Sequence, residues 1–73
     1  NISGRGWLID ILNCVNNIKS TDFFLNDIYE FESQLKLKHP DNQHIQAKIR
    51  QQLQMLRDKG FIEFLGNGHY RKI

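Results

Sequence analysis

The chain has 73 residues, a net charge of +2 and a hydrophobic fraction of 40%, as expected of one small globular domain. No run of residues approaches the ~20 apolar positions that a membrane-spanning helix needs. The single cysteine excludes an internal disulfide framework and is typical of a reducing compartment, so we expect a cytoplasmic protein.

The first residues include two glycines and no initiating Met. We therefore expect residues 1–6 to be the end of a linker from an upstream domain, and residues 7–73 to form the domain itself. A first helix is predicted from about Gly6 to Ile18, because apolar residues recur there at helical spacing. This apolar stripe consists of Leu8, Ile11, Leu12, Val15 and Ile18. Trp7 is either a core anchor for this helix or a contact surface near the linker.

A short strand and a second helix are expected next. Residues 23–25 are two phenylalanines and a leucine, and so short and aromatic a run is typical of a strand. Asn26 is the predicted cap of the second helix, and residues 39–42 end it. The expected buried side of this helix consists of Ile28, Phe31 and Leu35.

The third predicted helix has one apolar side and one polar side. Asp41 or Asn42 is its expected cap, and Lys59 with Gly60 marks its end. The apolar stripe consists of Ile45, Ile49, Leu53 and Leu56. A step of about 100° per residue places on the opposite side Gln43, Ala47, Arg50 and Gln54. Because Gln and Arg match the hydrogen-bonding edges of adenine and guanine in the major groove, this pattern predicts a helix that docks on a core and reads a DNA duplex.

The chain ends in a predicted β-hairpin. Residues 61–65 and 69–73 form its strands, and the Gly-Asn-Gly run at 66–68 tolerates the positive φ of a tight turn. Pairing with residues 23–25 completes a three-stranded sheet and stabilises a hairpin that is marginal alone. The predicted fold class is therefore α+β, a winged helix-turn-helix with three helices, a short strand and a C-terminal hairpin as its wing.

Positive charge is concentrated in the second part of the chain. Residues 42–73 carry six basic and two acidic side chains, a net charge of +4. Residues 1–41 carry four basic and six acidic side chains, a net charge of −2. A phosphate backbone would attract the charge of the helix and hairpin. The alternative is that these charges form an ordinary solvated helix face.

Three runs carry a more specific pattern: IQAKIRQQLQMLRDKGFIEF at 45–64, RGW at 5–7 and YRK at 70–72. With their spacing, they resemble the C-terminal domains of DpnI-like restriction endonucleases over nearly the whole chain. The resemblance implies a winged helix that binds GATC when its adenines carry N6-methyl groups. It also implies a bacterial parent protein, a type IIM restriction endonuclease with an N-terminal metal-dependent nuclease domain. One departure is Asn67, which stands between the wing glycines where these domains have a basic residue.

The chemistry of this target suits the third helix. N6-methylation leaves one N6 hydrogen and the N7 acceptor at the major-groove edge, so an amide such as that of Gln still pairs. Burial of two adjacent methyl groups at about 0.8 kcal/mol each supplies only about 1.6 kcal/mol, a ~15-fold preference. Stronger discrimination needs a group that is left unpaired at the unmethylated site. Ala47 either leaves room for a methyl group or is simply a good helix former.

Two sets of candidate DNA-binding residues follow from the pattern and the resemblance. The base-reading candidates are Gln43, His44, Ala47, Arg50, Gln51 and Gln54. The phosphate candidates are Arg5, Lys48, Asn67, His69, Tyr70, Arg71 and Lys72. Arg50 is the preferred partner for guanine, with a phosphate contact or a surface salt bridge as alternatives. The ring of Tyr70 is expected to pack in the sheet and to leave its hydroxyl to a phosphate.

Other residue combinations do not indicate catalysis. The three histidines and Cys14 lack the close spacing of metal ligands, and Cys14 lies beside the first apolar stripe as a small core residue. No acidic residue has a lysine two positions later, so Pro40-Asp41 and Lys48 do not form a nuclease motif. With no nucleophile, base and orienting group together, we expect no enzymatic activity, no metal and no cofactor in this fragment.

The expected partner is double-stranded DNA, bound by a monomer. Two competing interpretations remain at this stage. Winged helices also serve as protein-interaction modules, and a basic winged helix can bind DNA without sequence preference. The exposed side of the third helix distinguishes a protein-interaction module from a DNA-binding module. Protein-binding surfaces favour aromatic and aliphatic anchors, whereas this side carries Gln, Arg and Ala.

Overall fold

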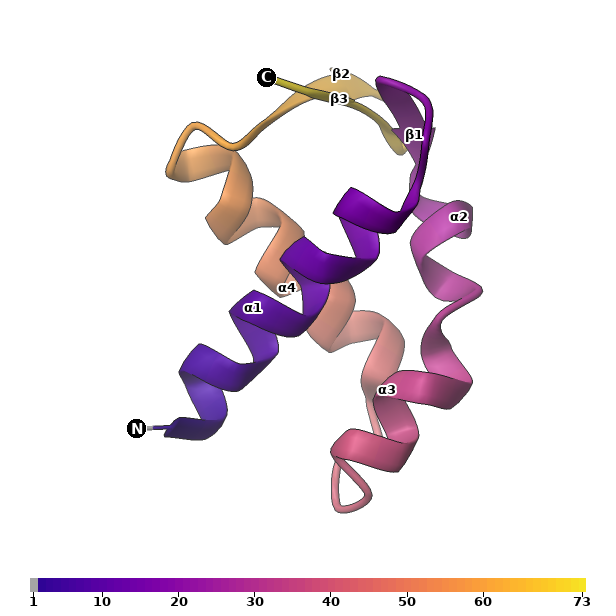
Figure 1. The fold of residues 1–73 in the computed structure, drawn as a ribbon, viewed down its shortest axis with the longest axis vertical. Helices are drawn as coiled ribbons and strands as arrows, with labels where there is room; N and C mark the ends of the chain where they lie inside the picture. Colours follow the sequence, from indigo (N-terminus) through magenta and orange to yellow (C-terminus); the bar gives the residue numbers. More distant parts are fainter. Residues whose placement is uncertain (1) are drawn as a thin grey trace.

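The computed structural model describes the backbone of residues 2–73 and the side chains of residues 6–73. Within this part of the chain there are four helices and three strands (Figure 1). In chain order they are α1 (Ile2–Asn17), β1 (Asp22–Phe24), α2 (Leu25–Tyr29), α3 (Glu32–Lys38), α4 (Ile45–Asp58), β2 (Ile62–Gly66) and β3 (His69–Lys72). The sheet lies at one end of the molecule, and α1 crosses α4 below it (Figure 1). No helix in residues 2–73 is both long enough and apolar enough to cross a bilayer.

The sheet confirms the predicted winged helix-turn-helix. Its strands are antiparallel in the order β1-β3-β2, so β1 completes the wing, and each strand lies within one residue of its predicted position. The turn between β2 and β3 has positive φ at Gly66, Asn67 and Gly68, with values of 99°, 53° and 70°. Glycine and asparagine adopt such values at the lowest cost, which explains the Gly-Asn-Gly run.

The first helix begins earlier than predicted, at Ile2 rather than near Gly6. Glycine is unfavourable in a helix by about 1 kcal/mol but does not forbid it, and each added residue contributes a hydrogen bond to a helix that is already nucleated. Helical backbone therefore extends into the segment predicted as a linker. The position of the domain boundary stays a prediction.

The prediction of a single second helix is wrong, because this segment forms α2 and α3. At Phe31 the backbone leaves the helical region, with φ −87° and ψ 4°. Its N–H donates to the carbonyl of Ile28, 2.9 Å away, instead of to the residue four positions before. This tighter turn bends the chain around the core and leaves Ile28 and Leu35 both buried.

The predicted cap of the second helix is also displaced. Asn26 lies inside α2, and the residue that precedes the helix is Phe24. The N–H of Phe24 donates to a carboxylate oxygen of Asp27 at 2.7 Å. A carboxylate in the first turn thus satisfies a backbone donor that would otherwise lack a partner.

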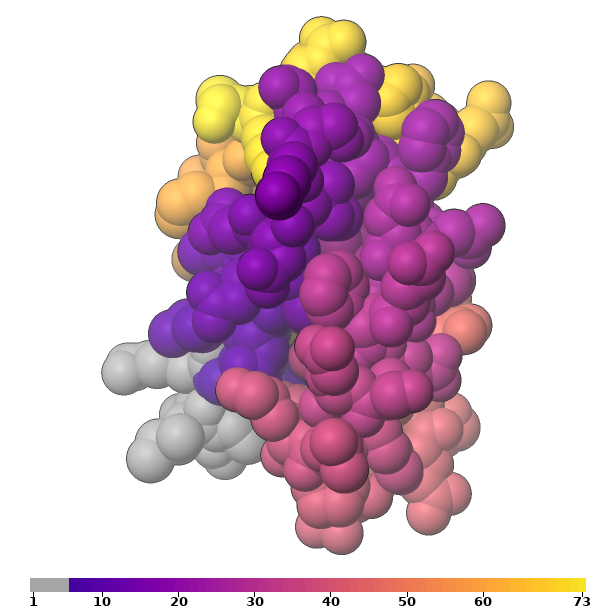
Figure 2. All heavy atoms as spheres, turned by 45° about the vertical axis from the view of Figure 1, so that its right-hand side comes forward, coloured from indigo at the N-terminus to yellow at the C-terminus, as the bar shows by residue number. Residues whose placement is uncertain are grey.

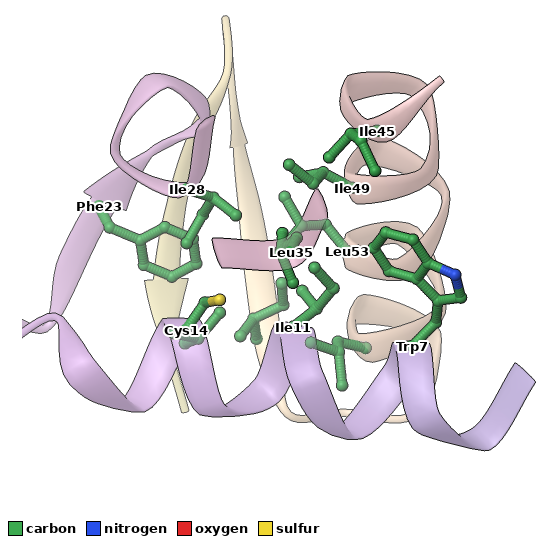
Figure 3. Packing of buried hydrophobic residues seen from close by; sticks show 12 residues of the cluster. Trp7, Ile11, Cys14, Phe23, Ile28, Leu35, Ile45, Ile49 and Leu53 are labelled. Atoms are coloured by element: carbon green, nitrogen blue, oxygen red, sulfur yellow. The ribbon is translucent and has the colours of Figure 1, made fainter. Parts of the chain in front are cut away.

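The core lies between α1, α4 and the inner face of the sheet (Figure 3). The apolar stripe of α4 is confirmed, with exposed fractions of 5% or less at Ile45, Ile49, Leu53 and Leu56. Trp7 is buried and is therefore a core residue, and its ring stacks on His39 with centroids 4.0 Å apart. Burial, and secondarily the charge of Asp10, raise the pKa of the Cys14 thiol to about 11, as expected of a core cysteine.

We predict that Leu53→Ala lowers the free energy of unfolding by about 2–5 kcal/mol, because it leaves a cavity where the stripe meets the core. Gln54→Ala, on the exposed side of the same helix, is the control and changes it by less than about 0.5 kcal/mol. Urea denaturation followed by circular dichroism measures both. Small effects for both variants would contradict the burial of the stripe.

Candidate nucleic-acid interface

The turn before α4 is held by polar contacts. Lys36 Nζ donates to the carbonyls of Pro40 and Asn42 at 3.0 and 2.9 Å. The side-chain oxygen of Asn42 accepts a hydrogen bond from the N–H of His44 at 2.7 Å. The helix begins at Ile45, immediately after His44, so the prediction of Asp41 or Asn42 as its cap is wrong. Asn42 closes the preceding turn instead, because its short side chain bonds the backbone two residues on.

The polar side of α4 is exposed. Figure 2 shows the face formed by α1, α2 and α3, on which little of α4 is visible. All base-reading candidates are exposed, namely Gln43, His44, Ala47, Arg50, Gln51 and Gln54. The first two lie in the turn before the helix rather than on it, because α4 begins later than predicted.

These candidates fall into two groups. Around a shallow depression at the start of α4 lie four of them, Gln43, His44, Ala47 and Gln51. Lys48, a phosphate candidate, lines the same depression, as do Asp41 and Asn42. The other two, Arg50 and Gln54, lie on the side of α4 that faces the sheet.

Between α4 and the sheet lies a second depression, which we call the α4–sheet hollow. Its lining residues are Arg50, Gln54, Arg57, Phe64 and Tyr70. Arg57 follows Arg50 by seven positions, so both guanidinium groups project from the same side of the helix. Neither Arg57 nor Phe64 was among the DNA-binding candidates that the sequence indicated.

Arg50 is held by a residue outside α4. Its Nη1 donates to the hydroxyl of Tyr29, at the end of α2, at 2.7 Å. A guanidinium has five N–H donors in a rigid plane, so this bond orients the group and leaves most of its donors for a ligand. Sequence reasoning missed Tyr29 because no periodicity relates two residues that are 21 positions apart and meet only where α2 packs on α4.

The phosphate candidates on β3 contact other parts of the protein. Arg71 Nε donates to Asp22 Oδ1 at 3.1 Å, and His69 Nε2 lies 3.2 Å from the other oxygen of Asp22. Lys72 Nζ donates to the carbonyl of Ile18. A phosphate at this strand would therefore have to displace a carboxylate from Arg71. The role of these residues as phosphate ligands stays a prediction.

The remaining phosphate candidates are dispersed. Asn67 is exposed at the tip of the wing, and Lys48 is half-buried on α4. The ring of Tyr70 stacks on Phe23 with centroids 5.4 Å apart, as predicted for packing within the sheet. Arg5 lies outside the described side chains. Within residues 6–73, no three His, Cys, Asp or Glu side chains lie close enough together to hold a metal ion.

Comparison with known protein families agrees with this arrangement. The family model of the C-terminal DpnI type, described as the Dam-replacing helix-turn-helix domain, matches residues 3–72. The match extends from the first turn of α1 to the last residue of β3. It therefore includes the turn before α4, the whole of α4 and the wing.

We predict that Asp22 makes the stability of the domain sensitive to acid. The hydrogen bond from Arg71 holds the pKa of the Asp22 carboxyl below its usual 3.8. A carboxyl whose pKa is lower in the folded state stabilises the fold above its unfolded pKa, and this contribution is lost as pH falls through the folded pKa. Wild-type protein should therefore lose more stability than Asp22→Asn between about pH 5 and about pH 2, as measured by urea denaturation.

The matched variant for this comparison is Arg71→Ala, which removes the donor of the hydrogen bond to Asp22. Its stability should also fall less than that of the wild type over this pH range. Parallel profiles for wild type and Asp22→Asn would show that the contact with Arg71 does not contribute to folding.

Proposed function

This chain belongs to the family of Dam-replacing helix-turn-helix domains, and on that premise we propose that it binds GATC sites in duplex DNA whose adenines carry N6-methyl groups. The observation that supports this proposal is the polar, exposed side of α4, which lies opposite a fully buried apolar stripe. In a winged helix-turn-helix this helix enters the major groove, where base edges are distinguishable.

The depression at the start of α4 is our proposed methyl-reading region. Ala47 lines it with the smallest side chain of the polar side, and the amides of Gln43 and Gln51 lie around it. An amide pairs with the N6 hydrogen and N7 of a methylated adenine, while the space above an alanine accepts the methyl group. Because two methyl groups supply only about 1.6 kcal/mol, the rest of the discrimination is assigned to polar groups that lose a partner at unmethylated DNA.

We assign Arg50 to guanine. A guanidinium that is oriented by Tyr29 presents its remaining donors in a plane, which matches the O6 and N7 acceptors of guanine. In this proposal one domain binds one palindromic site asymmetrically. The parent protein is proposed to be a type IIM restriction endonuclease in which this domain recognises the target and an upstream nuclease domain cuts it.

The exposed side of α4 argues against a protein-interaction module. Within the described residues, Met55 is the one large apolar side chain of α4 that is exposed, at 40%. Protein-binding surfaces are enriched in aromatic anchors, which this side of the helix lacks. Sequence-indifferent DNA binding is distinguished from our proposal by comparing affinities for methylated, unmethylated and scrambled duplexes.

We predict that the isolated domain binds a doubly methylated GATC duplex more tightly than the unmethylated duplex, by at least the ~15-fold that burial of two methyl groups supplies. Fluorescence anisotropy at about 150 mM salt measures both affinities, because salt at that level weakens non-specific binding. A methylated duplex with a scrambled site is the control. Equal affinities for all three duplexes would contradict specific recognition and favour sequence-indifferent binding.

We predict that Arg50→Ala costs about 1–3 kcal/mol at the methylated GATC site and flattens the preference among sites, because a base contact is lost. Tyr29→Phe removes only the hydroxyl that orients Arg50. It should shift the preference in the same direction by a smaller amount, with the thermal unfolding midpoint unchanged.

The control is Lys59→Ala, at an exposed position just past the end of α4. It should leave the preference among sites intact. If Arg50→Ala weakened binding to every duplex by the same factor, Arg50 would be a phosphate ligand and not a guanine reader.

A further inference from the structure

Two polar side chains that line the α4–sheet hollow, Arg57 and Tyr70, have no role in the base contacts proposed above. We propose that this hollow is a binding site for one backbone phosphate of the DNA, held by the guanidinium of Arg57 and the hydroxyl of Tyr70. This inference rests on the proposed function and deepens it, because it fixes where the DNA strand passes between α4 and the wing.

The polar groups that line the hollow can donate hydrogen bonds to an anion. They are two guanidinium groups, the amide of Gln54 and the phenol of Tyr70, and no carboxylate is among the lining residues. Phosphate oxygens only accept hydrogen bonds, and two positive charges close together favour their negative charge. The hollow is therefore complementary to phosphate in both charge and hydrogen bonding.

Arg57 is available to such a ligand. Its guanidinium contacts Asp58, the next residue, at 3.1 and 3.2 Å. Both side chains are exposed, at 40% and 65%, and exposed ion pairs contribute little to stability. A DNA phosphate can therefore replace the carboxylate of Asp58 at small cost.

Tyr70 presents its hydroxyl from a fixed ring. The ring stacks on Phe23 at 5.4 Å, and Phe64 lies tilted against it at 5.3 Å. Both guanidinium groups line the same hollow as this phenol. Burial raises the pKa of the Tyr70 phenol, and the positive charges of Arg57 and Arg50 act against this rise. The phenol is neutral at neutral pH and keeps its O–H as a donor. Phe64, 46% exposed, adds an apolar wall that suits a deoxyribose.

The hollow lies on one face of the sheet, and the phosphate candidates Arg71 and His69 lie on the other. Successive residues of a strand point to opposite faces of the sheet, so Tyr70 faces the side of α4 and Arg71 faces away from it. On that outer face Arg71 and His69 contact Asp22, and His69 also stacks on Phe24 at 4.5 Å. The outer face is thus partly neutralised, whereas the hollow lies beside the recognition side of α4.

The test is the salt dependence of binding to duplexes with and without methylated GATC, between about 50 and about 200 mM salt. For Arg57→Ala, the slope of log K against log salt should fall in magnitude by about 1 for both duplexes, because one phosphate contact is lost. Tyr70→Phe, which keeps the ring in the sheet, should weaken both duplexes by a similar factor with little change of slope. Arg57→Lys should restore the slope.

Lys59→Ala is the matched comparison, because it removes a positive charge at an exposed position just past the end of α4, outside the hollow. It should leave the slope unchanged. An unchanged slope for Arg57→Ala, or an equal fall in slope for Lys59→Ala, would overturn the proposal, as would an Arg57→Ala variant that changes only the preference between duplexes. Thermal unfolding of each variant verifies that it is folded.

The two proposals fail in different ways. If wild-type protein bound both duplexes equally while Arg57→Ala still lowered the slope, methyl recognition would be wrong and the phosphate site would stand. If the preference for methylated DNA held while Arg57→Ala and Tyr70→Phe changed neither slope nor affinity, the phosphate site would be wrong.

Discussion

The burial of the α4 stripe against α1 and the sheet is the contact on which the rest of the structure depends. Ile49, Leu53 and Leu56 are each 0% exposed, so the rotation of the helix about its axis is fixed by three side chains in a close-packed core. Because a helix turns once in about 3.6 residues, burial of one side determines which residues face solvent. The position of Ala47, Arg50 and Gln54 on the outside is therefore a consequence of core packing.

The sheet adds a second constraint. Strand β3 lies between β1 and β2, so the wing is tied to the segment that follows α1. A row of aromatic rings, Phe23, Tyr70 and Phe64, crosses the three strands on the face toward the helices. Two rings of this row, Phe64 and Tyr70, line the hollow beside α4. The same alternation of side chains leaves Arg71 on the other face, beside Asp22.

Much of the fold was predictable because local rules determine it. Helical spacing identified the stripes of α1 and α4, and the Gly-Asn-Gly run identified the hairpin turn. Helix ends were less predictable, since the break at Phe31 and the late start of α4 depend on contacts such as those of Lys36 with the following turn. The partners of candidate residues were not predictable: Asp22 and Arg71 are 49 positions apart and meet only through strand pairing. The exposed side of the helix was therefore predictable from the sequence, whereas the partners of the basic residues were not.

The proposed DNA-binding surface extends from the turn before α4 to the hollow beside the wing. Heteronuclear NMR titration with a doubly methylated GATC duplex measures which residues the DNA contacts. The largest shift changes should fall on Gln43, Ala47, Gln51, Gln54, Arg57 and Tyr70. Signals of Asp22 and Phe24 on the outer face of the sheet should change little. Shift changes concentrated on that outer face, with the exposed side of α4 unaffected, would contradict the proposed surface.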